Sequence, residues 1–325
     1  MKVLVVGLGS MGKRRIRLMR QAFPDICICG VDTNKDRMAE VSSLGVEKVY
    51  TTISEAVEDY RPEISFVCTA PLSHYKIIRE LLLNNLHVFT ELNLVSDGYQ
   101  ELIDLAKEKG LVLFLSSTLL YRKDLQYIIN SVNDKKVNYI YHCGQYLPDW
   151  HPWENYKNFF VNETRTNGCR EILAIDLPWL LAAMGEVNKI SVVSDKISNL
   201  EINYNDNYFI TLQHENGSKG TIIVDIVSRK ARRSLEIFSE NVHILWDGTP
   251  KSLLSFNEDT KEMDQVETYK EIDKNKNYSD NIIENAYTDE IFTFISCIQK
   301  KSKPLYNFEN DIVTLDLIDK IEGKA

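Results

Sequence analysis

Three glycines near the start of the chain constrain its fold more than any other feature. Gly7, Gly9 and Gly12 form a G-x-G-x-x-G pattern that directly follows the apolar run 2–6 and opens an amphipathic stretch at 11–21. In this context the first glycine permits a tight turn, the second lets a ligand approach the backbone, and the third lets a helix pack closely on a strand. The pattern therefore predicts a strand, a phosphate-binding turn and a helix, in that order.

The alternation of apolar runs and amphipathic stretches continues to residue 118, and it predicts repeated βα units around a parallel sheet. The expected strands are Lys2–Val6, Ile26–Val31, Ile64–Thr69, His87–Thr90 and Val112–Ser116. The expected helices are Met11–Gln21, Lys35–Leu44, Ile53–Val57, Ser73–Asn84 and Tyr99–Lys109. We therefore expect an α/β protein whose residues 1–118 form a doubly wound Rossmann domain.

From residue 119 onward the pattern changes to long alternating strands, which predicts an α/β domain over 119–325 with a large, mainly antiparallel open sheet. The expected strands are 137–146, 189–194, 208–214, 220–227 and 234–246, and the expected helices are 169–184 and 280–300. The segment 258–277 is rich in Lys and Asn and poor in apolar residues, so we expect a solvated loop there.

The glycine pattern predicts NAD as the cofactor. Backbone N–H groups around Ser10 and Met11, together with the positive end of the helix dipole, would bind the phosphates. Asp32 ends the second strand, where a carboxylate would accept the adenosine ribose hydroxyls and repel a 2′-phosphate. This favours NAD over NADP, although Lys35 and Arg37 lie shortly downstream and keep NADP open.

Three consecutive basic residues lie in the first turns of the same expected helix. Lys13, Arg14 and Arg15 follow the glycine pattern directly and are within reach of bound phosphates. For at least two of them we expect a solvated basic face instead.

Composition excludes several kinds of partner. The formal charge of -9 is spread along the chain, which disfavours nucleic acid, and no stretch approaches the roughly 20 apolar residues of a membrane helix. The six cysteines lack metal-ligand spacing, so we expect reduced thiols and no metal site. The N-terminal run has no signal-peptide pattern, and we expect a cytoplasmic protein.

The segments GLGSMGKRRIR, VCTAPLSHYKI and HVFTELNL resemble the glucose-fructose oxidoreductase, inositol dehydrogenase and rhizopine-catabolism (Gfo/Idh/MocA) family. The later segments GQYLPDWHPWENYK and RRSLEIFSENVHILWDG resemble a subfamily associated with bacterial surface-polysaccharide and nonulosonic-acid biosynthesis. The resemblance implies an NAD-dependent oxidoreductase that acts on a secondary alcohol of a sugar, sugar phosphate or nucleotide sugar. It also implies a homo-oligomer formed through the C-terminal sheet.

The resemblance assigns further cofactor residues in the first domain. Thr69 and the backbone after it would line the nicotinamide side, and His74 begins the next helix. Glu91 ends a strand at the carboxyl edge of the sheet, where ligands bind in this topology, so we expect it near the nicotinamide ribose. For His74, capping or packing is an equally good interpretation.

The chain departs from the family at its proton-handling positions. The family uses a Lys from a Glu-Lys-Pro motif and an Asp/His pair, but Leu92 and Ile175 occupy the Lys and His positions here. A group that exchanges the hydroxyl proton during hydride transfer is still required. His151 is the first candidate because its ordinary pKa near 6.5 suits the task. Glu171, at the family's Asp position, and Asp176 are the other two candidates.

By the same resemblance, a loop in the second domain would fold over the nicotinamide and contact the substrate. Its candidate substrate residues are Tyr146, Trp150, Trp153, Tyr156 and Lys157. A hydrogen-bonded loop residue at 151 and tryptophans that anchor the loop to the core are the structural alternatives.

Two other functions remain open. Tightly bound NAD could be reduced and reoxidised within one turnover of an epimerase, lyase or hydrolase. Alternatively the chain is a catalytically silent NAD-binding partner protein, which Leu92 and Ile175 favour.

Overall fold

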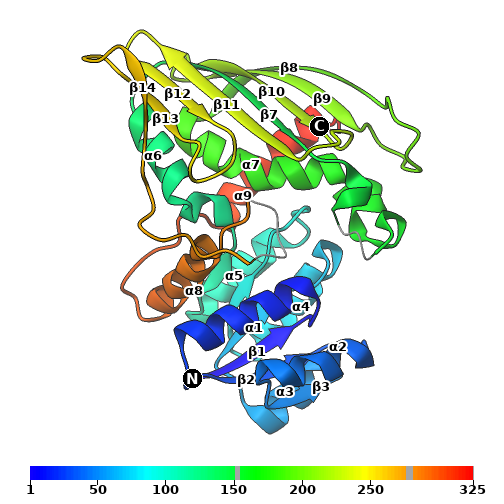
Figure 1. Ribbon diagram of the computed structural model, residues 1–325. Helices are drawn as coiled ribbons and strands as arrows, with labels where there is room; N and C mark the ends of the chain where they lie inside the picture. The colour runs from blue at the N-terminus through cyan, green and yellow to red at the C-terminus, as the bar shows by residue number, and fades with distance from the viewer. Residues whose placement is uncertain (151–153, 276–280, 325) are drawn as a thin grey trace. The chain divides into compact units, whose positions relative to one another are not determined.

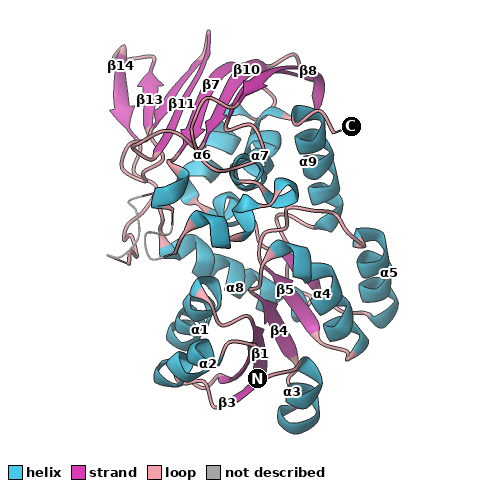
Figure 2. Cartoon of the chain, turned by 90° about the vertical axis from the view of Figure 1, so that its right-hand side faces the viewer, coloured by secondary structure: helices cyan, strands magenta, loops and turns pink. Residues whose placement is uncertain are grey.

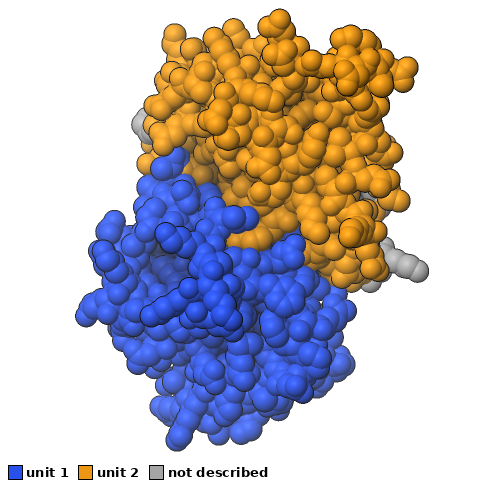
Figure 3. Space-filling view, turned by 90° about the vertical axis from the view of Figure 1, so that its left-hand side faces the viewer, with its two compact units in different colours: residues 1–118, 286–313 blue, residues 119–285, 314–325 orange. Residues whose placement is uncertain are grey.

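The computed structural model describes residues 1–150, 154–275 and 281–324 (Figure 1). The chain forms two compact units (Figure 3). Unit 1 contains Met1–Thr118 and Ala286–Val313, and unit 2 contains Leu119–Asn285 and Thr314–Ala325. The sequence predicts a single division after residue 118, but the segment Ala286–Val313 returns to unit 1.

Unit 1 is built on a six-stranded parallel sheet with the strand order β3-β2-β1-β4-β5-β6. The strands are β1 (Lys2–Val6), β2 (Cys27–Val31), β3 (Lys48–Tyr50), β4 (Ile64–Val67), β5 (His87–Thr90) and β6 (Leu113–Leu115). The four central strands are almost entirely buried, as expected for a parallel sheet covered on both faces. The predicted Rossmann topology is confirmed.

Helices cover both faces of this sheet (Figure 2). They are α1 (Ser10–Ala22), α2 (Lys35–Glu40), α3 (Ile53–Tyr60), α4 (His74–Leu83), α5 (Tyr99–Lys109) and most of α8 (Glu284–Ile298). The α8 residue Phe294 packs edge-on against Phe66 and Phe89, with ring centres 5.5 and 5.6 Å apart. This aromatic contact explains why the segment after residue 285 groups with the first unit, since Phe294 is fully buried against the sheet.

Unit 2 contains an eight-stranded sheet with the order β14-β13-β12-β11-β7-β10-β9-β8. Its strands are β7 (Asn138–Gly144), β8 (Val187–Asp195), β9 (Asn207–His214), β10 (Lys219–Asp225), β11 (Arg232–Ser239), β12 (Val242–Trp246), β13 (Leu254–Asn257) and β14 (Glu262–Gln265). Every neighbouring pair is antiparallel except β7 and β10, which confirms the mainly antiparallel sheet.

The helices α6 (Lys123–Val132) and α7 (Gly168–Met184) pack on one face of this sheet (Figure 2). A last helix, α9 (Phe308–Ile321), runs from the residues of unit 1 into those of unit 2. On the sheet face turned away from α7, Val193 is 72% exposed, Phe209 50% and Ile140 47%. In the described part of the chain that face thus keeps apolar side chains in contact with solvent.

Two expectations about unit 2 are wrong in detail. The expected single strand 234–246 is a hairpin of β11 and β12, because a turn at 240–241 reverses the chain within one continuous alternating pattern. The expected loop 258–277 contains β14, an edge strand that pairs with β13. Three of the four β14 residues are exposed, so its composition resembles that of a loop.

Within the described residues, no helix is long and apolar enough to cross a membrane. All six cysteines are free thiols, as the sequence predicts. The same described residues contain no group of His, Cys, Asp and Glu that could hold a metal ion.

Candidate functional site

The glycine-rich turn lies where β1 is flanked by β2 on one side and β4 on the other, at the switch point of the sheet. Gly7 has a φ of +90°. A Cβ on Gly12 would lie 2.0 Å from the carbonyl oxygen of Gly7, so only glycine fits there. A Cβ on Gly9 would meet nothing nearer than the Arg37 guanidinium at 3.8 Å. Gly7 and Gly12 therefore shape the turn, and Gly9 leaves space above it open.

Helix α1 starts directly from this turn. Gly9 is its N-cap, and Ser10 and Met11 are its first two residues, with no side-chain cap and no acidic residue in the first turn. No carboxylate in the first turn therefore neutralises the positive end of this 13-residue helix. This arrangement suits the binding of an anion such as a pyrophosphate.

Asp32 follows β2, at the position that the sequence predicts. Its side chain is largely buried, and its two carboxylate oxygens accept hydrogen bonds from the backbone N–H groups of Leu8, at 2.7 Å, and Asn34, at 2.8 Å. A carboxylate has about four acceptor positions, so lone pairs remain for ribose hydroxyls. The turn and the carboxylate are thus linked directly.

The expected solvated basic face on α1 is wrong. Lys13 is partly exposed and pairs with Glu40, but Arg14 and Arg15 are buried. The Arg14 guanidinium lies 4.6 Å from the centre of the Tyr287 ring, because α8 covers this side of α1. The α8 segment is remote in sequence, so the basic run alone does not reveal it.

Arg15 is the centre of a buried ion-pair network in unit 1. Its Nε lies 2.6 Å from Glu91 Oε1, and its Nη2 lies 2.7 Å from Glu290 Oε2. Burial lowers the pKa of Arg15, but the two carboxylates outweigh this effect and raise it above its ordinary value. Glu290 also accepts hydrogen bonds from Ser116 and Ser117. Glu91 is therefore held by α1, and its expected contact with the nicotinamide ribose stays a prediction.

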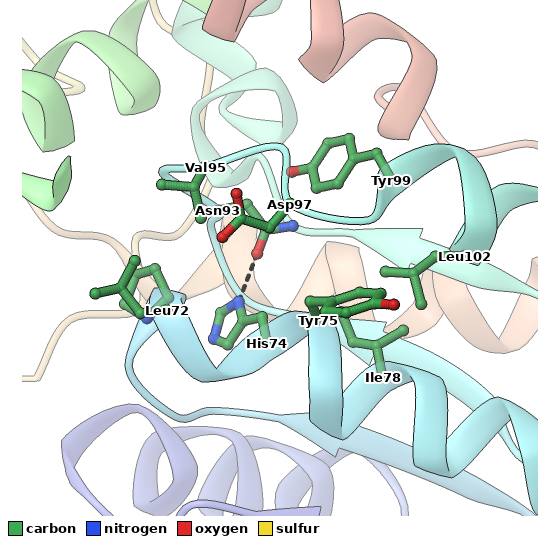
Figure 4. Close-up of a pocket in the computed structure, with 10 residues that line it drawn as sticks. Leu72, His74, Tyr75, Ile78, Asn93, Val95, Asp97, Tyr99 and Leu102 are labelled. Carbon is green, nitrogen blue, oxygen red and sulfur yellow. Dashed lines mark hydrogen bonds between the residues drawn. The ribbon is translucent and has the colours of Figure 1, made fainter.

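His74 connects the turns that follow β4 and β5. One ring nitrogen lies 2.5 Å from Asn93 Oδ1 (Figure 4), and the other lies 2.9 Å from the carbonyl oxygen of Thr69. Burial lowers the pKa of His74 despite these contacts. Asn93 follows Leu92, where the Glu-Lys-Pro motif of the resembled family has proline, and its side-chain oxygen is what holds the His74 ring. The packing interpretation of His74 fits these contacts, and Thr69 is held in place by it.

A small pocket opens beside this link in unit 1, between the start of α4, the turn after β5 and α5 (Figure 4). Its lining residues are Pro71, Leu72, His74, Tyr75, Ile78, Asn93, Val95, Asp97, Tyr99 and Leu102. No residue of the glycine-rich turn lines it.

In unit 2, Glu171 lies in the first turn of α7, which Asn167 caps by accepting a hydrogen bond from the N–H group of Arg170 at 2.8 Å. Burial raises the pKa of Glu171 to about 8. Its Oε2 atom is buried and has no hydrogen-bond partner in the described part of the chain. A carboxyl group with a pKa this close to neutrality can both donate and accept a proton.

Asp176 lies one and a half turns further along α7, in a cluster between the helix and the sheet. Its carboxylate accepts hydrogen bonds from Tyr141 at 2.5 Å, from Trp179 and from Cys143, and pairs with Arg233 at 3.0 Å. These donors occupy both oxygens, so the geometry favours a structural role over the candidate catalytic one.

The expected substrate residues occupy different environments. Tyr146 lies under the Arg229 guanidinium, whose carbon is 3.9 Å from the ring centre. Trp150 donates a hydrogen bond to the carbonyl oxygen of Gln145, and its ring lies 3.5 Å from the Cβ position of Gly168, at the start of α7. Tyr146 and Trp150 thus belong to the end of unit 2 that carries Glu171.

Tyr156 and Lys157, the remaining expected substrate residues that the structure describes, both contact Glu201. Tyr156 accepts a hydrogen bond from the N–H group of Glu201, and Lys157 forms an exposed ion pair with the carboxylate of the same residue at 2.5 Å. His151 and Trp153 lie outside the described residues. Arg229 is a residue that sequence reasoning missed, although four of the five positions 229–233 are basic.

The N-terminal part of the chain is similar in sequence to known proteins. Residues 1–117 match the model of the family described as "Oxidoreductase family, NAD-binding Rossmann fold". Biliverdin reductase A of Homo sapiens is 28% identical over 137 residues, which are 42% of this chain and 46% of that protein. Myo-inositol 2-dehydrogenase of Thermotoga maritima is 24% identical over 140 residues, 42% of each chain. The chain thus spans less than half the length of these curated relatives.

Solved structures resemble the whole chain. An oxidoreductase from Agrobacterium radiobacter, in complex with NAD+, L-tartaric acid and magnesium, has a TM-score of 0.82 at 12% identity, covering 100% of this chain and 96% of the other. UDP-N-acetylglucosamine 3-dehydrogenase GnnA from Acidithiobacillus ferrooxidans has a TM-score of 0.77 at 13% identity, covering 100% and 97%. At such identities the likeness establishes the fold, including both sheets.

Proposed function

Residues 1–117 match the model of the Oxidoreductase family with an NAD-binding Rossmann fold (Gfo/Idh/MocA), and from this match we propose that the chain is an NAD-dependent dehydrogenase or reductase. Its substrate is a secondary alcohol, or the matching ketone, of a sugar, sugar phosphate or nucleotide sugar. In this proposal residues 1–118 bind NAD and residues 119–325 bind the substrate. The observation that carries the proposal is the turn in which Gly12 fits against Gly7 while Asp32 holds the backbone beside it.

The residues of unit 1 fit NAD. The open space at Gly9 admits a pyrophosphate, the start of α1 supplies N–H groups, and the Asp32 carboxylate accepts ribose hydroxyls. We propose NAD over NADP, because the negative charge of Asp32 repels a 2′-phosphate. The Arg37 guanidinium close to Gly9 opposes this preference without removing it.

Glu171 is the residue to which we assign proton exchange. Bound NAD would accept or supply the hydride, and in the same reaction the alcohol hydroxyl must lose a proton or the ketone oxygen must gain one. A neutral Glu171 donates that proton in the reducing direction, and the ionised form accepts it in the oxidising direction. Its buried oxygen without a protein partner supports this assignment.

A catalytically silent NAD-binding protein is the second candidate, and one observation favours it. Leu92 replaces the family lysine, and its neighbour Glu91 is held by the buried Arg15. An enzyme that recycles tightly bound NAD is the third possibility, and it predicts NAD that co-purifies with the chain.

The proposal is tested by mixing the purified chain with NAD and a panel of sugars, sugar phosphates and nucleotide sugars. The formation of NADH is measured by its absorbance. Removing a general acid or base costs about 100- to 10,000-fold in rate. Glu171→Gln should therefore lose turnover in that range and keep NAD affinity, whereas the exposed Glu163→Gln should lose neither. His151→Ala tests the other candidate. NAD binding without turnover of any substrate by the wild type would favour the silent protein.

The proposed assembly is a homo-oligomer formed through the sheet of unit 2. The exposed apolar residues Val193, Phe209 and Ile140 support it, since such a face needs a cover. A cytoplasmic location and a role in surface-polysaccharide biosynthesis complete the proposal, supported by the free cysteines and by the sequence resemblance of the later segments.

A further inference from the structure

A strongly basic loop joins β10 to β11 in unit 2. Four of the five positions 229–233 carry Arg or Lys, in a chain whose formal net charge is -9. Such a concentration of positive charge attracts anions, unless each cation already has a partner within the protein. The partners of the four residues therefore decide whether the loop can bind a ligand.

Two of the four cations interact with a carboxylate of a described residue, and a third lies on the other face of the strand from Arg233. Arg233 points toward α7 and pairs with the buried Asp176. Side chains alternate between the faces of a strand, so Arg232 points to the opposite face. Lys230 contributes to the electrostatic environment of Asp247. Arg229 remains, and it has no hydrogen bond or ion pair to any residue that the structure describes.

The backbone before Arg229 is held rigidly. Asp225, at the end of β10, accepts hydrogen bonds from the N–H groups of Val227 and Ser228 at 2.9 and 2.7 Å, and from the Ser228 hydroxyl at 2.9 Å. His142 lies 2.7 Å from the same carboxylate. A Cβ at position 144 would lie 2.4 Å from Asp225 Oδ2, so Gly144 makes room for this arrangement.

The Arg229 side chain is positioned as well. Its guanidinium carbon lies 3.9 Å from the centre of the Tyr146 ring, which holds the flat group while leaving its N–H groups available. The N–H group of Leu147, next to Tyr146, donates to the carbonyl oxygen of Ile226 at 3.0 Å. The side chains of Leu147 and Ile226 both lie within 3.3 Å of the Cβ position of Gly168, at the start of α7. Arg229 and Glu171 thus lie at the same end of unit 2.

We propose that Arg229 binds an anionic group of the substrate, so the substrate is an acidic or phosphorylated sugar and not a neutral one. The proposal rests on the proposed function, because it assigns a ligand class to the same site. A guanidinium forms paired hydrogen bonds with phosphate and carboxylate alike, so both groups satisfy the geometry.

Binding of three related sugars to NAD-saturated protein, measured by calorimetry, tests this inference. N-acetylglucosamine 1-phosphate carries a phosphate, glucuronate carries a carboxylate, and N-acetylglucosamine is neutral. Saturating NAD occupies the site in unit 1, so a phosphate cannot bind there instead. At least one anionic sugar should bind at least tenfold more tightly than the neutral one. The sugar that binds more tightly shows whether Arg229 recognises a phosphate or a carboxylate.

Arg229→Met should weaken that binding by about tenfold to 100-fold, since charge-assisted hydrogen bonds are lost. Arg229→Lys should restore part of it, and Arg232→Met is the matched control that should change nothing. Binding of neither anionic sugar, an equal loss in both methionine variants, or neutral sugar bound as tightly as the anionic ones would overturn the inference. Failure to bind NAD would instead overturn the proposed function.

Discussion

Replacing Glu171 with glutamine should remove the loss of stability that unit 2 undergoes as the pH rises. Burial raises the pKa of Glu171 to about 8 in the folded chain, whereas an unfolded glutamate titrates near 4.3. Between these values the folded state holds a proton that the unfolded state has released. Each rise of one pH unit in this interval therefore lowers the free energy of unfolding by about 1.4 kcal/mol.

The upper limit of this loss is about 5 kcal/mol, reached above about pH 8. Glutamine is neutral at every pH, so the variant should escape the loss. We expect Glu171→Gln to match the wild type within about 1 kcal/mol at pH 5. At about pH 9 the variant should be more stable by about 2 to 5 kcal/mol, the lower value allowing for relaxation around the charge.

Urea denaturation followed by tryptophan fluorescence measures this difference in the relevant unit. All four tryptophans, at positions 150, 153, 179 and 246, lie in the part of the chain that contains Glu171. Glu163→Gln is the matched control, because Glu163 is exposed and close in sequence. A stability difference between Glu171→Gln and the wild type that stays constant from pH 5 to pH 9, as in the control, would refute the reasoning from burial.

Three further predictions concern unit 1. Gly9→Ala should abolish NAD binding in calorimetry without lowering the melting temperature. Gly12→Ala should lower both the NAD affinity and the melting temperature, because only a Cβ at position 12 collides with backbone. Equal melting temperatures of the two variants would contradict this. Asp32→Asn should narrow the preference for NAD over NADP by about tenfold, as measured by the two dissociation constants, since the charge that repels a 2′-phosphate is lost. Arg15→Met should lower the free energy of unfolding by about 3 to 5 kcal/mol, measured by urea denaturation, because it leaves buried carboxylates unpaired. Arg79→Met removes an exposed ion pair with Glu101 and should cost much less.

Much of unit 1 was accessible from sequence, because its elements follow one regular pattern. The predicted bounds of 2–6, 87–90 and 99–109 match β1, β5 and α5. The short edge strand β3 was missed, since its three residues are mostly exposed and present no apolar run. Helix α9 was also missed, because the polar residues Asp311 and Thr314 lie on its buried side and interrupt the apolar pattern.

The cofactor turn could be predicted from sequence because its residues are close together in the chain. The ion-pair network around Arg15 could not be predicted in this way. Gly7, Gly12 and Asp32 act through the backbone next to them, so their spacing carries the information. Arg15 lies 76 positions from Glu91 and 275 from Glu290, and nothing local marks it as buried. The raised pKa of Glu171 likewise comes from burial that sequence does not display.

The return of Ala286–Val313 to unit 1 bears on how this protein can be divided or recombined. A fragment that stops at residue 118 would leave Phe66 and Phe89 without Phe294, and Arg15 without Glu290. Such a fragment should aggregate or be degraded when expressed by itself. A chimera that exchanges the Rossmann half with a homologue therefore has to transfer two separate stretches of coding sequence together.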